Sequence, residues 1–114
     1  MNMKVQGIGI DMIEIRRFRG FGKNNRFLKN NFSKEELDYC FSFKDSATHL
    51  AGTFATKEAV IKILTRSVPL ALIEVKRNRN GKPEIFIKNR REKSIMVSIS
   101  HTEKLALAFT IKND

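Results

Sequence analysis

Two acidic side chains, Asp11 and Glu58, occupy positions where the surrounding pattern predicts apolar or small residues. Asp11 ends the segment 7–11 (GIGID), which is typical of a buried strand, and Glu58 lies in the segment 54–62, which is typical of a helix. A buried carboxylate needs a partner, commonly a cation or a metal. Carboxylate oxygens suit magnesium, so this pair in a very basic chain predicts a magnesium site that handles phosphate.

The alternation of residues along 3–11 predicts a strand with two different faces. Gly7 and Gly9 fall on the same face as Asp11, whereas the isoleucines of the segment fall on the other. Because glycine has no side chain, another part of the molecule can approach the backbone closely on the aspartate's face. That approach is either a ligand or an ordinary packed helix.

The chain is strongly basic, with 22 lysine and arginine residues against 12 acidic residues and a formal net charge of +10. Such a surplus favours anionic partners, and nucleic acid, anionic lipid, nucleotide phosphate or an acidic protein would each satisfy it. The single cysteine, Cys40, excludes an internal disulfide and a cysteine-rich zinc site, and is expected to be buried. Residues 1–6 do not form a secretory signal, and no stretch approaches the ~20 apolar residues of a membrane span. We therefore expect a cytoplasmic protein with no membrane partner.

Hydrophobic periodicity predicts an α+β chain that forms a single domain over residues 1–114. Ser33 and Glu36 form a capping box at the start of one helix, and Asn80-Gly81 is the turn signal of a hairpin. The predicted helices cover residues 13–21, a short segment around 27–32, a segment starting at 33, and a long segment from about 46 to 64. The predicted strands cover 3–11, the hairpin 71–88, 95–100 and 105–111, and 88–93 is predicted to be a loop.

Several charged residues in these elements have more than one interpretation. Arg16, Arg17 and Arg19 form either a solvated face or a docking surface for an acidic partner. Glu58 and Lys62 are one turn apart on the long helix and would form an exposed ion pair if that helix stood alone. The apolar residues that flank Glu58 favour a buried role instead.

Four segments of the chain form a recognisable set. They are 7–18 (GIGIDMIEIRRF), 54–59 (FATKEA) with Lys62, 80–83 (NGKP) and 97–102 (VSISHT). Together they resemble the holo-acyl-carrier-protein synthases, which are small 4′-phosphopantetheinyl transferases. One such segment would be a weak match, but all four occur in the family's order and span nearly the whole chain.

The resemblance implies an enzyme that moves the 4′-phosphopantetheine arm of coenzyme A onto a serine of apo-acyl-carrier protein. The other product would be adenosine 3′,5′-bisphosphate, and the step would serve fatty acid biosynthesis. The implied structure is the 4′-phosphopantetheinyl transferase fold, an antiparallel sheet packed on a long helix. The resemblance also implies a homotrimer with active sites between neighbouring subunits.

The family's functional residues match positions of this chain. Its magnesium-binding aspartate and glutamate match Asp11 and Glu58, so Mg²⁺ is the expected cofactor. Its coenzyme-contacting lysine and histidine match Lys62 and His101, and the arginine that docks the carrier protein matches Arg17. Lys62 would place a cation near the leaving phosphate, and either Glu58 or a metal-held water would accept the serine proton.

Two positions depart from the family pattern. Thr53 stands where the family usually has an arginine, and the segment 63–67 (ILTRS) replaces a glycine-containing turn. These departures concern the contacts with coenzyme and carrier protein, and Arg66 is a candidate for the missing charge. Without the resemblance, His101 would be interpreted as a hydrogen-bonded turn histidine. His49 is expected at the surface, because no metal-ligand spacing accompanies it.

Two non-enzymatic alternatives are open. A small nucleic-acid-binding module would use the basic charge, but no motif of that class appears, and the phenylalanines fall in apolar stripes instead of a stacking surface. A non-catalytic trimeric scaffold would require Asp11 and Glu58 to be ordinary ion-pair partners. The transferase interpretation accounts for both carboxylates, and we therefore expect no nucleic-acid partner.

Overall fold

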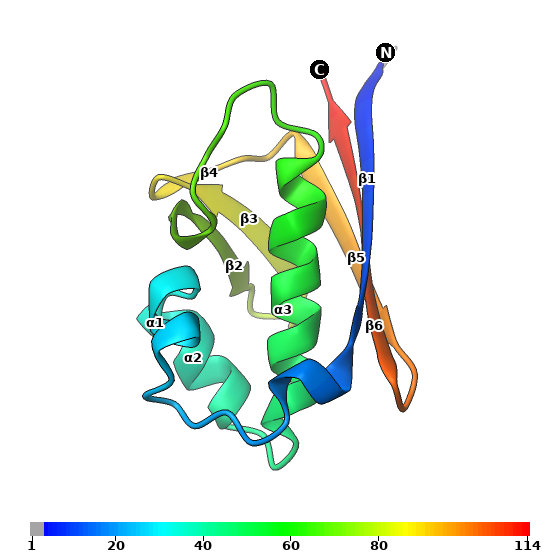
Figure 1. Cartoon of the computed structure of the whole chain (residues 1–114). Coiled ribbons are helices and arrows are strands. Elements are labelled where there is room, and N and C mark those ends of the chain that lie inside the picture. The colour runs from blue at the N-terminus through cyan, green and yellow to red at the C-terminus, as the bar shows by residue number, and fades with distance from the viewer. Residues whose placement is uncertain (1–3) are drawn as a thin grey trace.

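One long helix packs against two small antiparallel sheets in the computed structural model, which describes residues 4–114 (Figure 1). The first sheet has the strand order β1-β6-β5 and the second has the order β2-β3-β4, which makes this an α+β fold as predicted. The elements are β1 (Val5–Glu14), η1 (Ile15–Phe18), α1 (Arg26–Asn31), α2 (Lys34–Phe41), α3 (Ser46–Ile61), η2 (Leu70–Leu72), β2 (Ile73–Arg77), β3 (Pro83–Ile87), β4 (Arg90–Arg91), β5 (Ile95–His101) and β6 (Leu105–Asn113). Within residues 4–114, no helix combines the length and the apolar character needed to cross a membrane.

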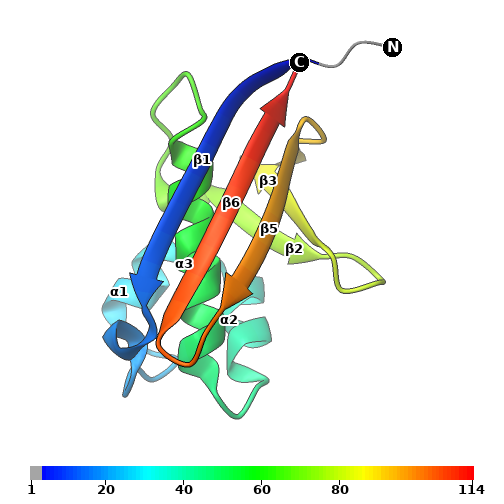
Figure 2. The same cartoon turned by 90° about the vertical axis from the view of Figure 1, so that its right-hand side faces the viewer.

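Helix α3 packs against the inner face of the β1-β6-β5 sheet (Figure 2), and small residues on β1 and β6 let it approach closely. Ala106 and Ala108 of β6 are fully buried. A methyl group at Gly9 of β1 would overlap the carbonyl oxygen of Ala59 on α3. The glycines therefore allow a helix, and not a ligand, to approach the strand on the face that carries Asp11.

Strand β1 is longer than predicted, because pairing with β6 continues through Glu14. The predicted helix over 13–21 is wrong for most of its length, and only a single 3-10 turn forms at Ile15–Phe18. Ile13 pairs with Ala106 and is buried. The sheet thus overrides a local pattern that favours a helix.

The outer face of this sheet is apolar and is left uncovered by residues 4–114, so the segment 7–11 is buried on one face only. This outer face is formed by side chains from all three strands. The residues are Ile8, Ile10 and Met12 of β1, their cross-strand neighbours Ile111, Phe109 and Leu107 on β6, and Met96 of β5. On β1 and β5 its residues are strongly exposed, with exposed fractions of 64% for Ile8, 53% for Ile10, 60% for Met12 and 50% for Met96. We refer to these seven residues as the outer sheet face.

The hairpin of β2 and β3 forms as predicted, with Gly81 at a positive φ of 81° at its tip. The segment 88–93 was predicted to be a loop, which is wrong at Arg90–Arg91, because these residues pair with β3 as β4. Lys88 and Asn89 make the intervening turn with positive φ values. Such a two-residue turn is typical of hairpins.

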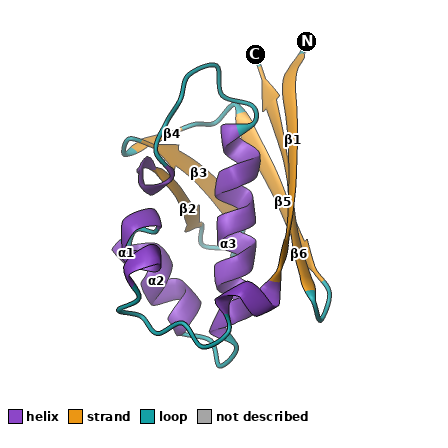
Figure 3. Cartoon of the chain, in the orientation of Figure 1, coloured by secondary structure: helices purple, strands orange, loops and turns teal. Residues whose placement is uncertain are grey.

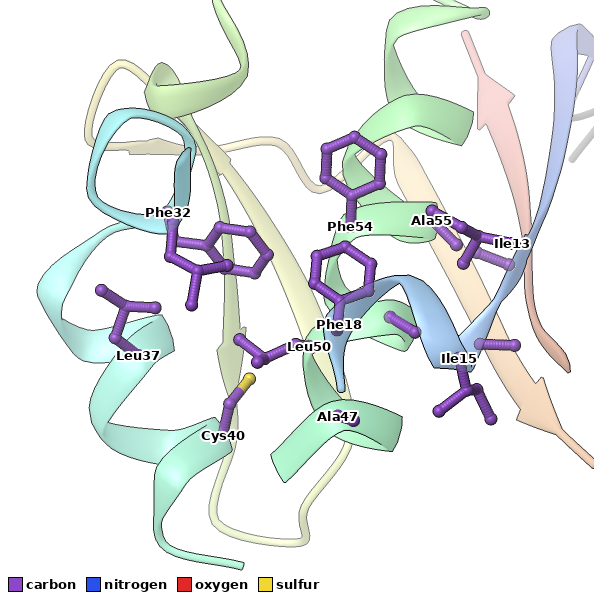
Figure 4. Packing of buried hydrophobic residues seen from close by; sticks show 14 of the residues in the cluster. Ile13, Ile15, Phe18, Phe32, Leu37, Cys40, Ala47, Leu50, Phe54 and Ala55 are labelled. Carbon is purple, nitrogen blue, oxygen red and sulfur yellow. The ribbon is translucent and has the colours of Figure 1, made fainter. Parts of the chain in front are cut away.

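Helices α1 and α2 pack on the side of α3 away from the β1-β6-β5 sheet (Figure 3). An aromatic cluster fills the space between them (Figure 4). The Phe54 ring centroid lies 5.7 Å from that of Phe18 and 6.4 Å from that of Phe32. Cys40 is buried as predicted, and burial raises the pKa of its thiol to about 11, so it is not a nucleophile at neutral pH.

A buried ion pair fixes α3 at the residue before Glu58. The Lys57 ammonium lies 2.6 Å from a carboxylate oxygen of Glu36 and also donates to the carbonyls of Asn31 and Leu70. Glu36 in addition accepts hydrogen bonds from backbone amides, including that of Ser33 in the predicted capping box. Burial raises the pKa of Glu36 and lowers that of Lys57, while their attraction opposes both shifts. The pair therefore joins α3 to α1, α2, η2 and β2.

Candidate functional site

Asp11 and Lys62 meet at the edge of the β1-β6-β5 sheet. Lys62 follows the last residue of α3, and its ammonium donates to the carbonyl oxygen of Ile10 at 2.6 Å. The same ammonium lies 3.4 Å from Oδ1 of Asp11, whose side chain is partly buried while that of Lys62 is half exposed. Two predicted site residues, 51 positions apart in the sequence, are thus brought together.

Glu58 lies on the same face of α3 as Lys62, one turn earlier. It does not form the i,i+4 ion pair that an isolated helix would favour, because Lys62 reaches Asp11 instead. Among residues 4–114, the Glu58 carboxylate has neither an ion-pair partner nor a hydrogen-bond donor within reach. A partly buried carboxylate left free beside a second one is a feature of cation sites.

The residues present fit a divalent cation that binds oxygen ligands. Asp11 and Glu58 supply hard carboxylate oxygens from facing elements, β1 and α3. The described part of the chain contains no group of three or more histidine, cysteine, aspartate or glutamate side chains that could enclose a metal. A cation held here would therefore keep coordination positions for water and for substrate oxygens.

His101 lies apart from this group within one chain. It ends β5, and β6 separates that strand from β1, since Asp11 and Ile99 both align with Ala108. Two strand spacings place β5 about 10 Å from β1, and α3 packs over the inner face between the two edges. The exposed His101 ring is 3.2 Å from the carbonyl oxygen of Thr102, which is the turn arrangement expected from the sequence alone.

The three arginines near η1 differ in how they are engaged. Arg16 pairs with Glu14 at 2.9 Å, and Arg19 pairs with Asp45 at 2.8 Å. Arg17 is exposed and has no acidic partner among residues 4–114. It is therefore the arginine of this cluster that remains available to an acidic protein.

Sequence reasoning missed a hollow on the β5 side of α3. It has a volume of about 180 Å³, and Arg77, His49 and His101 contribute to its lining. His49 was predicted at the surface, but it is half-buried, and its ring stacks on Phe43 with the centroids 3.6 Å apart. No local signal could have found this group, because its members come from α3, β2 and β5.

Comparisons with known proteins identify the family of this chain. Residues 7–110 match the family model of the 4′-phosphopantetheinyl transferase superfamily. A holo-acyl-carrier-protein synthase of Thermodesulfovibrio yellowstonii is 38% identical over 94% of this chain and 97% of that protein.

Solved structures with a similar fold belong to the same family. A holo-acyl-carrier-protein synthase of Bacillus anthracis in complex with CoA (3′,5′-ADP) has a TM-score of 0.80 and 26% identity, with 99% of each chain covered. The Helicobacter pylori enzyme in complex with coenzyme A has a TM-score of 0.75 and 27% identity, covering 95% of this chain and 100% of that one. The chain therefore belongs to the 4′-phosphopantetheinyl transferase superfamily, and within it to the holo-acyl-carrier-protein synthases.

Proposed function

We propose that Asp11, Glu58 and Lys62 form the centre at which this chain transfers 4′-phosphopantetheine from coenzyme A to a serine of apo-acyl-carrier protein, with Mg²⁺ as cofactor. The observation that carries the proposal is the contact between Lys62 and Asp11. The Glu58 carboxylate, which has no ion-pair partner within residues 4–114, lies on the same face of α3. Family membership makes the chain a transferase. The product, holo-acyl-carrier protein, would enter fatty acid biosynthesis.

The reaction is a displacement at phosphorus. The serine oxygen of the carrier protein attacks the phosphorus that bears pantetheine, and the bond from this phosphorus to the bridging oxygen breaks. Adenosine 3′,5′-bisphosphate then leaves with the extra negative charge. Lys62 would lie beside the departing phosphate and stabilise that charge, and its present contacts with Asp11 and Ile10 hold it at the site.

Asp11 and Glu58 would hold the magnesium ion. When bound, the ion would neutralise pyrophosphate charge and polarise the phosphoryl oxygens. The serine proton would pass to Glu58 or to a water held at the site. No described residue pairs with the Glu58 carboxylate, which supports either role.

The carrier protein would dock at Arg17. This residue is exposed, lies next to the paired Arg16, and belongs to a chain with a formal net charge of +10. An acidic partner would be steered toward such a surface. Arg17 would contribute mainly to docking, because it lies outside the Asp11 group.

A homotrimer with interfacial active sites is part of the proposal. The outer sheet face is a contiguous apolar surface that water would otherwise cover, and such surfaces mark protein interfaces. Packing three of these faces around an axis would bury them in a closed ring. His101 of one subunit would then complete the site that contains Asp11 of the next, which accounts for their separation within one chain.

The proposal treats residues 1–114 as one catalytic domain, because α3 contacts both sheets. The cytoplasmic location remains a prediction from the sequence.

Intact-mass analysis of apo-acyl-carrier protein tests the function. Incubation with this protein, coenzyme A and Mg²⁺ should add one phosphopantetheine arm of about 340 Da, and EDTA should prevent the addition. Asp11→Ala and Glu58→Ala should abolish the transfer and keep the circular dichroism spectrum. Glu35→Gln removes an exposed carboxylate and is the matched control, which should stay active. Near-normal transfer by either of the first two variants would refute the proposed centre.

A further inference from the structure

The Lys62 ammonium balances the charge of Asp11. Its Nζ lies 3.4 Å from Oδ1 of Asp11, and Asp11 forms no other ion pair within residues 4–114. The Asp11 side chain is only 21% exposed, and a carboxylate so far removed from water needs a nearby cation. Lys62 supplies that cation from the end of α3.

Lys62 is held loosely enough to leave Asp11. Its side chain is 51% exposed, whereas the Lys57 side chain on the same helix is fully buried and has three fixed partners. The short hydrogen bond of Lys62 goes to the backbone carbonyl of Ile10, at 2.6 Å, and the contact with Asp11 is longer. An ammonium has three donors on a flexible stem. Lys62 can therefore keep its bond to Ile10 while it exchanges Asp11 for another anionic group.

A divalent cation and Lys62 require the same carboxylate. Asp11 is a residue to which the proposed function assigns Mg²⁺, and the ammonium beside it repels a second cation placed there. Asp11, Glu58 and Lys62 together carry a formal charge of −1, whereas the two carboxylates alone carry −2. Lys62 therefore weakens cation binding for as long as it pairs with Asp11.

The pyrophosphate of a substrate removes this conflict. Its oxygens attract the Lys62 ammonium and so release Asp11, and they also add oxygen ligands for the cation. Cation and substrate thus both favour the arrangement in which Lys62 has left Asp11. Two ligands that favour the same arrangement strengthen each other's binding.

We propose that Lys62 is an internal competitor of the divalent cation. It pairs with Asp11 until the pyrophosphate of coenzyme A draws it away, and only then does the cation bind tightly. This rests on the proposed function, which places the cation on Asp11 and Glu58 and the departing phosphate beside Lys62. The role is additional to stabilising the leaving group, because it makes the chain take up the cation together with coenzyme A or after it.

Manganese binding in the absence of coenzyme A tests the competition. Mn²⁺ accepts the same oxygen ligands as Mg²⁺, and electron paramagnetic resonance measures its free concentration. Lys62→Met should bind Mn²⁺ about tenfold more tightly than the wild type, which is within the usual range of coupling between two sites. Lys112→Met is the matched control and should bind Mn²⁺ with wild-type affinity, because Lys112 contacts Gln6 of β1 and not Asp11. Equal affinities of Lys62→Met and the wild type, or an equal gain in the control, would overturn the proposal.

Lysine reactivity shows whether the cation displaces Lys62 in the wild type. Acylation with N-hydroxysuccinimidyl acetate, followed by mass spectrometry, reports how accessible each ammonium is. Saturating Mn²⁺ should speed the acylation of Lys62 severalfold and leave that of Lys112 unchanged. An unchanged rate at Lys62 would contradict the displacement.

These measurements separate the competition from the proposed function, since neither of them requires transfer. A protein that transfers phosphopantetheine, while Lys62→Met and the wild type bind Mn²⁺ equally, would reject the competition alone. If Asp11→Ala binds Mn²⁺ as tightly as the wild type, the cation lies elsewhere, and both the proposed centre and the competition fail.

Discussion

Replacing Gly9 by alanine is a direct test of how closely α3 must approach β1. The added methyl carbon would overlap the carbonyl oxygen of Ala59 and lie 2.8 Å from Oγ1 of Thr110. Both groups are fixed, since the Thr110 hydroxyl donates to the Ala59 carbonyl at 3.0 Å. Helix and strand must therefore separate by about 1 Å, because a packed interior has no free volume to absorb the methyl.

The expected cost follows from this overlap. Inserting a methyl into a close-packed contact costs about 1–3 kcal/mol, and occasionally more, and the backbone position of the clash places Gly9→Ala at the upper end. The urea midpoint should fall by at least about 1 M. Because Lys62 and Glu58 move with α3 and Asp11 stays on β1, a shift of about 1 Å should also lower kcat by about a hundredfold.

Urea unfolding and the carrier-protein mass assay measure the two effects. Gly22→Ala is the matched control, because a methyl at Gly22 meets nothing within 4 Å. It should unfold at the wild-type midpoint and stay active. A Gly9→Ala protein with wild-type stability and activity would show that α3 and β1 need not be in close contact.

Two further predictions concern assembly and the buried ion pair. When the Asp11→Ala and His101→Ala chains are co-expressed, a site between subunits is complete if one chain supplies an intact Asp11 and its neighbour supplies an intact His101. Random mixing of the two chains in trimers should therefore restore about one quarter of the sites. If both residues of a site came from the same chain, no site would regain activity. Lys57→Met should cost about 3–5 kcal/mol in urea unfolding, because it leaves the Glu36 carboxylate buried without a partner. Lys34→Met, which breaks an exposed ion pair, should have no measurable effect, and equal losses in both would contradict this role for the buried pair.

Local signals predicted most of the fold. The capping box at Ser33 is present, the long helix expected over about 46–64 spans Ser46–Ile61, and the Asn80-Gly81 hairpin has the expected turn. These features depend on residues close together in the sequence. The helix expected over 13–21 failed at its start, because residues 13 and 14 pair with β6, about ninety residues away.

The site was only partly predictable for the same reason. Spacing along one helix placed Glu58 beside Lys62, but the contact of Lys62 with Asp11 depends on how α3 crosses β1. The role of Gly9 as a packing position, and not a ligand-binding one, also depends on that crossing. Arg77 carried no signal of its own, because the hollow it lines forms only when distant elements pack together.

The pairing of β1 with β6 has a consequence for how the protein forms during synthesis. Ninety residues, 15–104, lie between these strands, and a ribosome adds that many in about 5–20 s. Throughout this interval β1 has no partner strand, and its apolar residues and backbone amides are open to other chains. Closing so long a loop is also slow compared with forming a helix. The protein should therefore be most prone to aggregation while nascent, and Asp11 should reach its position only in the last folding step.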